Sequence, residues 1–366
     1  MEKDSNVANS VIDNIFDFLR SLNNGMIKLQ TKLTRFKFIS SSSMKESNKT
    51  LHSPKVTVLM SVYNGQKYLS EAVDSILNQT FANFEFLIID DGSTDNSIKI
   101  INSYRDSRIV FIKQDNRGLP SALNIGLKNS KGKYIARMDA DDICFPERLE
   151  VQYAFLEACE DCVVVGSNAE VIDVHGMHLF TSDQDISWET IREKLPITPF
   201  FHSSTMFRKE EIIRCGGYNE KLLTAQDCLL FNQMAKYGEL WNIKKPLIKY
   251  RIVPNAVSMM KSKDSKIIIK IIEKILENGE LSNKDYIILK TIYNNKKKYY
   301  KYSNYYLKIG KIFIEHNFNR RYALKNLLLS VKNYPFSITA WFNLLLTFMP
   351  KFRIRKWKQS RGVEIN

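Results

Sequence analysis

The chain has 366 residues, 44% of them hydrophobic, so it can bury a core of about 200 residues and still leave flanking segments. Its net charge of +15 is confined to the tail, because residues 261–366 hold 23 Lys plus Arg against 7 Asp plus Glu, whereas residues 1–260 hold 31 against 32. Residues 1–260 therefore carry no excess of basic charge, and five cysteines, an odd number, favour a reducing cytosol.

The first 54 residues predict an accessory segment. Apolar residues at helical spacing form one face of an amphipathic helix: Val11, Ile12, Ile15, Phe16, Leu19 and Leu22. Basic residues and then four serines, residues 40–43, follow with the composition of a linker. No basic-then-apolar secretory signal precedes them, so we expect a cytoplasmic protein.

Strand-like and helical patterns alternate from residue 56 onward. Apolar β-branched runs predict strands at residues 56–62, 84–89, 109–112 and 134–138. Helical spacing of apolar residues predicts helices at residues 68–77 and 119–127. This order is typical of an α/β fold with an open, mostly parallel sheet and flanking helices.

Acidic loops follow two of the predicted strands. Asp139, Asp141 and Asp142 come directly after the strand at residues 134–138, and Asp90 and Asp91 follow the run at residues 84–89. Ligands of such sheets bind beyond the carboxyl ends of the strands, where these loops converge. Carboxylates one residue apart suit an octahedral Mg²⁺ or Mn²⁺ that keeps positions open for phosphate oxygens, although a lone Asp-x-Asp triplet is usually a solvated turn.

The first strand is not followed by the usual phosphate-binding motifs. Neither G-x-G-x-x-G nor G-x-x-x-x-G-K-[ST] occurs there, so a nicotinamide cofactor and an NTPase site both lose their main support. A site that binds diphosphate through a cation and carboxylates instead suits an enzyme whose leaving group is a nucleoside diphosphate.

Five blocks in order resemble family-two glycosyltransferases with the GT-A fold. They are residues 58–65, 75–81, 89–95, 139–141 and 216–218, and the resemblance covers about residues 55–258. It implies an inverting transfer of a sugar from a nucleotide donor, usually UDP-linked, to an acceptor hydroxyl. The general role that it implies is bacterial surface polysaccharide or glycolipid assembly, with a glycan or lipid-linked acceptor.

The resemblance also implies roles for single residues of the donor site. Asp91 would hydrogen-bond the nucleobase, with Ser61 and Tyr63 lining the same pocket. Asp139 would face the ribose and share a metal ion, Mn²⁺ or Mg²⁺, with Asp141. Three more positions are expected to contact the donor, and these are Arg117, Arg251 and Ser258. An arginine suits bidentate phosphate contact, and the alternative for Arg251 is a surface arginine that ends a strand.

Asp227 matches the catalytic base of the family. Gln226 stands where relatives carry a Glu, which leaves the acceptor or sugar contact of that neighbour open. Asp227 could otherwise merely cap the helix that follows. His202 lies in a block like the one beside the acceptor cleft and is expected either to touch acceptor or phosphate or to be a structural residue.

The tail predicts a helical appendage. Apolar clusters without strand-like alternation occur at residues 267–276, 299–313, 322–331 and 338–348. The apolar stretch around Trp341 is about fourteen residues long, short of the roughly twenty that span a bilayer. Basic residues follow it, so it fits an interfacial anchor on the anionic inner face of the plasma membrane, unless its apolar face packs on the catalytic domain.

The expected domains are residues 1–54, the catalytic residues 55–260 and the basic helical residues 261–366. A sugar-phosphate nucleotidyltransferase is the enzymatic alternative, but it needs a glycine-rich, arginine-bearing loop after the first strand. A catalytically inactive glycan- or membrane-binding scaffold is the other, and the retained acids argue against it. No recognition motif supports nucleic-acid binding.

Overall fold

The computed structural model describes residues 53–184, 187–197, 199–254, 262–294, 298–315 and 319–349. The predicted accessory segment, residues 1–54, lies outside these ranges except for its last two residues. The strands are β1 (Val56–Val62), β2 (Phe84–Asp91), β3 (Ile109–Gln114), β4 (Tyr134–Asp139), β5 (Ile143–Cys144), β6 (Cys162–Ile172), β7 (His178–Thr181), β8 (Met206–Arg208) and β9 (Glu239–Arg251).

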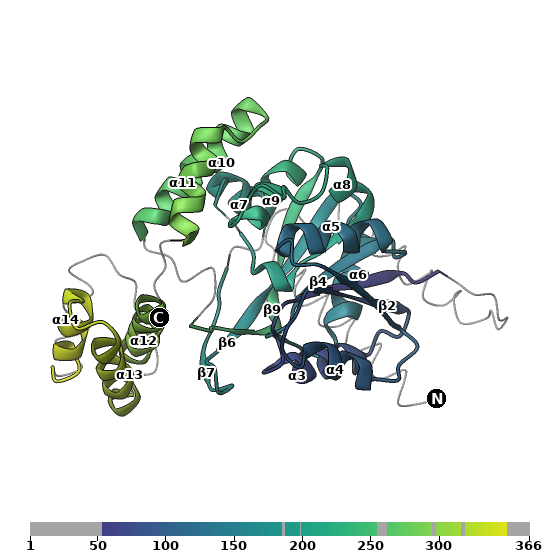
Figure 1. The fold of residues 1–366 in the computed structure, drawn as a ribbon. Helices are drawn as coiled ribbons and strands as arrows, with labels where there is room; N and C mark the ends of the chain where they lie inside the picture. The colour runs from purple at the N-terminus through teal and green to yellow at the C-terminus, as the bar shows by residue number, and fades with distance from the viewer. Residues whose placement is uncertain are drawn as a thin grey trace.

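The strands form one mixed sheet in the order β3-β2-β1-β4-β8-β6-β9-β5, with β7 paired to β6 (Figure 1). The first four strands pair in parallel, as the alternating sequence pattern predicts, and β6 and β9 also pair in parallel. β8 joins the two halves through antiparallel pairing on both sides. The parallel register places Ser61 beside both Ile89 and Asp139, so the loops after β1, β2 and β4 leave the sheet at one edge.

Helices cover both faces of this sheet. The helices of the sheet region are α3 (Leu69–Leu77), α4 (Ser97–Ser103), α5 (Leu119–Asn129), α6 (Arg148–Ala158), α7 (Trp188–Lys194), the short 3-10 helix η1 (His202–Ser204), α8 (Lys209–Arg214) and α9 (Gln226–Met234). α3, α4 and α6 bury their apolar faces against alternate residues of β1, such as Val58 and Met60. α5, α7, α8 and α9 pack on the opposite face, against Leu59 and Ile135.

The C-terminal region is helical, as predicted, and comprises α10 (Ser262–Asn278), α11 (Asn283–Asn294), α12 (Lys298–Glu315), α13 (Arg320–Asn333) and α14 (Ile338–Leu346). The sequence patterns missed α11. Isoleucines of α10, among them Ile268 and Ile272, pack on Leu229 of α9. α12 packs with α13 and α14 and contacts the turn between β6 and β7, where the Val174 amide donates a 3.3 Å hydrogen bond to the Tyr305 hydroxyl.

Among the described residues, no helix has the length and apolar character needed to cross a bilayer.

Candidate active site

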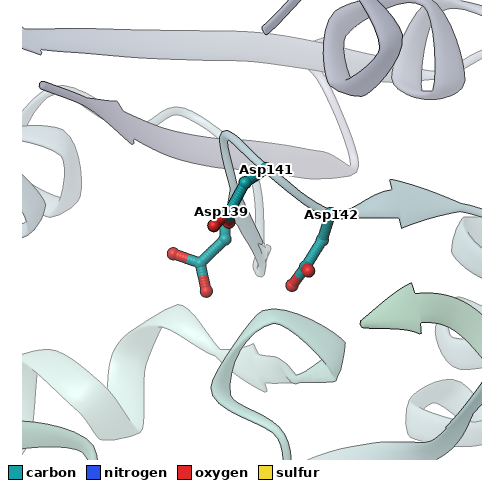
Figure 2. Close-up of side chains that lie close together, drawn as sticks. All are labelled: Asp139, Asp141 and Asp142. Carbon is teal, nitrogen blue, oxygen red and sulfur yellow. The ribbon is translucent and has the colours of Figure 1, made fainter. Parts of the chain in front are cut away.

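Three carboxylates gather in the loop after β4. Asp139 ends the strand, and Asp141 and Asp142 occupy the turn that leads into β5 (Figure 2). One ligand oxygen of each lies within 4.8 Å of the others. Three hard oxygen ligands at this separation fit a divalent cation such as Mg²⁺ or Mn²⁺, which leaves further coordination positions for phosphate oxygens.

The carboxylate of Asp142 is hydrogen-bonded by other groups of the protein. Its side chain is buried, accepts a hydrogen bond from the Ser203 hydroxyl and accepts another, at 2.7 Å, from the backbone amide of Arg251. Burial and the neighbouring charges of Asp141 and Asp139 raise the pKa of Asp142. Asp142 therefore fastens the acidic loop to η1 and β9, which leaves Asp139 and Asp141 as the half-buried carboxylates at the site.

Asp141 favours a cation for electrostatic reasons. Burial, and then the charge of Asp139, raise its pKa to about 7, while Arg137 and Arg251 oppose the rise. A divalent ion between the two carboxylates would remove their mutual repulsion and favour both charged forms.

Arg137 is a buried arginine that the sequence interpretation left without a role. It lies two residues before Asp139 on β4, so both side chains emerge on the same face of the strand. Its guanidinium forms an ion pair with Asp139. Its spacing of two residues from Asp139, which places both side chains on one face of the strand, is the sequence signal that could have linked Arg137 to the site.

Asp227 lies in the same site as the acids of β4. It occupies the first turn of α9, two residues after Ala225, which has a left-handed backbone with φ 57°. Burial raises the pKa of Asp227, and the charge of Asp139 adds to the rise, whereas amides of the first turn of α9 and Arg137 lower it. The half-buried Gln226 precedes Asp227 at the start of the helix. Residues almost ninety positions apart are thus within electrostatic reach of each other.

His202 and Tyr218 line the same region. The His202 Nε2 atom lies 2.8 Å from the Tyr218 hydroxyl. Burial, and then the charge of Arg137, hold the pKa of His202 well below its usual range, so the imidazole is neutral at pH 7. The Tyr218 backbone is held by Asn124 of α5, whose amide oxygen accepts from the Tyr218 N–H at 2.8 Å. Tyr218 was noted only as part of a motif and had no expected role.

The predicted nucleobase contact, Asp91, is buried at the end of β2. Its Oδ1 accepts from Gln114 Nε2 at 2.5 Å and from the Arg117 amide at 2.9 Å, and its Oδ2 accepts from the Gly118 amide at 2.9 Å. These bonds fix the loop at residues 114–118 against the end of β2. The nucleobase role of Asp91 stays a prediction.

The other donor residues lie around this edge in different environments. Ser61 is half-buried beside Asp139, and Tyr63 in the loop after β1 is 54% exposed. The Arg117 side chain is exposed. Ser258 lies outside the described residues.

Arg251 is buried at the end of β9, so it is not the surface arginine of the alternative interpretation. Its Nε donates to the Asp141 carbonyl at 2.8 Å, and its Nη2 lies 2.5 Å from Glu71 Oε2. These contacts support the backbone of the acidic loop. A contact with donor phosphate stays a prediction.

Comparison with known proteins identifies the family. Residues 57–217 match Glycosyl transferase family 2. The chain is 35% identical over 205 residues to the putative glycosyltransferase EpsE of Bacillus subtilis, a match that covers 54% of this chain and 73% of EpsE. The chain belongs to glycosyltransferase family 2.

Other similarities agree with this assignment. An uncharacterized glycosyltransferase of Rickettsia prowazekii, RP339, is 34% identical over 217 residues, which cover 55% of this chain and 65% of that protein. The fold resembles that of residues 1–349 of S. aureus TarS in complex with UDP-GlcNAc, with a TM-score of 0.51, 18% identity, and coverage of 82% of this chain and 92% of that one. The predicted GT-A fold is confirmed.

Proposed function

We propose that this family 2 glycosyltransferase transfers a sugar, with inversion, from a UDP-linked donor to an acceptor hydroxyl. The observation that supports the proposal is that Asp227 of α9 lies within electrostatic reach of Asp139, which clusters with Asp141, although α9 and β4 are far apart along the chain. One site thereby combines a proton acceptor with ligands for the cation of a diphosphate leaving group.

Asp227 is the proposed general base. A carboxylate in contact with the acceptor hydroxyl removes its proton while the oxygen attacks the anomeric carbon on the face opposite the diphosphate. The amides at the start of α9 favour the ionised form of Asp227 that this step requires. The acceptor side includes the neutral His202, which can exchange a hydrogen bond without carrying charge, and Gln226.

Asp139 and Asp141 are the proposed cation ligands. When bound there, Mn²⁺ or Mg²⁺ would supply charge stabilisation to the departing diphosphate. The nucleoside is expected to lie against Ser61, Tyr63 and Asp91, near the exposed Arg117.

The proposal is tested with nucleotide sugars and two matched substitutions of one carboxylate each. Asp141→Asn is expected to abolish Mn²⁺-dependent UDP binding, measured by calorimetry. Asp227→Asn is expected to retain UDP binding and to lose transfer by about a thousandfold or more, since it removes the base itself. Asp161→Asn, at an exposed aspartate in the turn between α6 and β6, is the control.

The opposite pattern, in which Asp227→Asn loses UDP binding and Asp141→Asn loses only transfer, would refute the assigned roles. An inactive scaffold predicts that the wild-type chain turns over none of the donors. A nucleotidyltransferase predicts release of pyrophosphate from a nucleoside triphosphate.

Glycolipid or surface-polysaccharide assembly is the proposed context, with a lipid-linked acceptor at the inner face of the plasma membrane. The supporting observation is α14, a helix with apolar residues on two faces. Ala340 and Leu344 are buried against the neighbouring helices, whereas the other face is exposed. That exposed face, with its flanks, consists of Phe336, Ile338, Trp341, Phe342, Leu345 and Phe348.

Charge favours a bilayer over a protein as the partner of this face. Residues 298–349 hold eight Lys plus Arg against one acid, Glu315, and six more basic residues follow before the chain ends. Aromatic residues beside lysines and arginines are typical of helices that lie in the interface of anionic membranes. The basic residues after 349 lie outside the described part of the chain.

Flotation of the full chain with vesicles tests this surface. We expect binding to vesicles that contain about 30% phosphatidylglycerol, and loss of that binding by about tenfold in the double variant Ile338→Ser/Leu345→Ser. Ile287→Ser on α11, which alters a 62% exposed isoleucine elsewhere, is the control. Unchanged flotation of the double variant would refute a membrane role for α14.

A further inference from the structure

Arg137 differs from Arg148 and Arg208, two other arginines of the sheet region, in what its guanidinium contacts. Arg208 donates to the carbonyls of Leu156 and Cys159 at 2.7 and 2.9 Å, and Arg148 donates to the carbonyl of Arg137 at 2.7 Å. These two guanidinium groups support the backbone. The Arg137 side chain is only 1% exposed and instead faces a carboxylate of the candidate cation site, Asp139.

The hydrogen bonding of Arg137 is also incomplete. Among the residues that the structure describes, none accepts a hydrogen bond from its buried Nε. A buried donor without a partner costs free energy, so a purely structural arginine would be expected to satisfy it. The guanidinium therefore belongs to the site and not to the scaffold around it.

The charge of Arg137 reaches both ends of the site. It acts on Asp139 and Asp142 at the cation end, and on Asp227 and Tyr218 at the acceptor end. Without this charge, neighbouring carboxylates that are largely shielded from water would have little to balance them in the absence of a metal ion.

We propose that Arg137 is a positioning residue that serves as the resident counter-ion of the acidic site. It neutralises Asp139 before a divalent cation arrives and shares its charge with Asp227 across the site. The inference rests on the cation site proposed above. Its consequence is that Arg137 and the divalent cation compete electrostatically for Asp139, so the arginine reduces the affinity for the cation while it supports the ionised base.

Manganese binding to the full-length chain without donor tests this proposal. Free Mn²⁺ is measured by electron paramagnetic resonance at pH 8. Because a positive charge near a cation site opposes binding, Arg137→Met is expected to bind Mn²⁺ about tenfold more tightly than the wild type. Arg137→Lys, which keeps the charge, is expected to stay within about threefold of the wild type.

Transfer is expected to change in the opposite direction. Arg137→Met should lower kcat by about tenfold or more, and Arg137→Lys should recover part of that loss. A merely structural role would weaken metal binding and turnover together. Should Arg137→Met fail to fold, Arg137→Gln takes its place, because the amide keeps hydrogen-bond donors without the charge.

Asp139→Asn supplies the internal control. In that background, Arg137→Met is expected to lose most of its effect on Mn²⁺ affinity, since the carboxylate for which they compete is gone. Equal or weaker Mn²⁺ binding by a folded Arg137→Met variant would overturn the counter-ion role. Absence of Mn²⁺ binding by the wild type would instead refute the proposed cation site on which the inference rests.

Discussion

Gly217 offers a sharp test of how the site is held, because its neighbour Gly216 is a matched control. Both glycines have left-handed backbones, with φ +74° and +83°. A Cβ atom at Gly217 would lie 2.7 Å from Oδ1 of Asn124, whereas one at Gly216 would meet no heavy atom within 4 Å. Gly216→Ala therefore introduces backbone strain alone, and Gly217→Ala adds a steric clash.

The clash falls on a side chain that is already engaged. Asn124 accepts from the Tyr218 N–H at 2.8 Å and donates to the Tyr218 carbonyl at 2.9 Å. The left-handed backbone costs an alanine about 1–2 kcal/mol in either variant. Loss of two hydrogen bonds at about 1 kcal/mol each adds about 2 kcal/mol for Gly217→Ala only.

Urea unfolding followed by tryptophan fluorescence measures the free energy of unfolding of both variants. We expect Gly217→Ala to be about 2 kcal/mol less stable than Gly216→Ala, because any change in the unfolded chain is common to both. Adding Asn124→Ala to Gly217→Ala should cost little more, since the clamp is already broken. Equal stability of the two glycine variants would refute the role of Asn124 in fixing Tyr218.

Two further predictions concern packing away from the site. Burial raises the pKa of Glu157, but its bonds with Lys133 and the neighbouring tyrosine outweigh that effect and hold the pKa below its usual value. Glu157→Gln should therefore lower the free energy of unfolding at pH 7, and the difference from the wild type should disappear as the pH falls below about 4, as urea titrations at several pH values would reveal. Arg208→Met should destabilise the chain by about 2–4 kcal/mol, because it removes the donor to the carbonyls of Leu156 and Cys159. Arg208→Lys should recover part of the loss, and unchanged thermal unfolding of Arg208→Met would contradict this account.

The first half of the fold could be predicted from the sequence because its signals are local. Residues 56–62, 84–89, 109–112 and 134–138 are continuous apolar runs, and each becomes a strand of the parallel part of the sheet. The second half depends on long-range pairing. β8 has only three residues and is held in the sheet by antiparallel pairing with β4 and β6, which no local sequence pattern predicts.

The same distinction applies to the site. The acids after β4 follow directly from strand periodicity, since a parallel strand ends where its polar residues begin. The spacing of two places Arg137 on the same strand face as Asp139, but a charged residue within a strand normally indicates a solvated face, so its burial could not be predicted. Arg251 stands out in the sequence as an expected phosphate ligand. In the structure, however, its guanidinium is engaged with Glu71 and the backbone of the acidic loop.

The three acids Asp139, Asp141 and Asp142 illustrate why composition alone cannot assign roles. The sequence pattern gives Asp142 no role of its own, because its partners, Ser203 and the Arg251 amide, lie 61 and 109 residues further along the chain. Because these contacts hold Asp142 in the interior, the turn before it must present Asp141 to the site. A buried carboxylate thus fixes the position of an accessible one, and the cost of burying the first is offset by two hydrogen bonds that also join β4, η1 and β9 into one rigid edge.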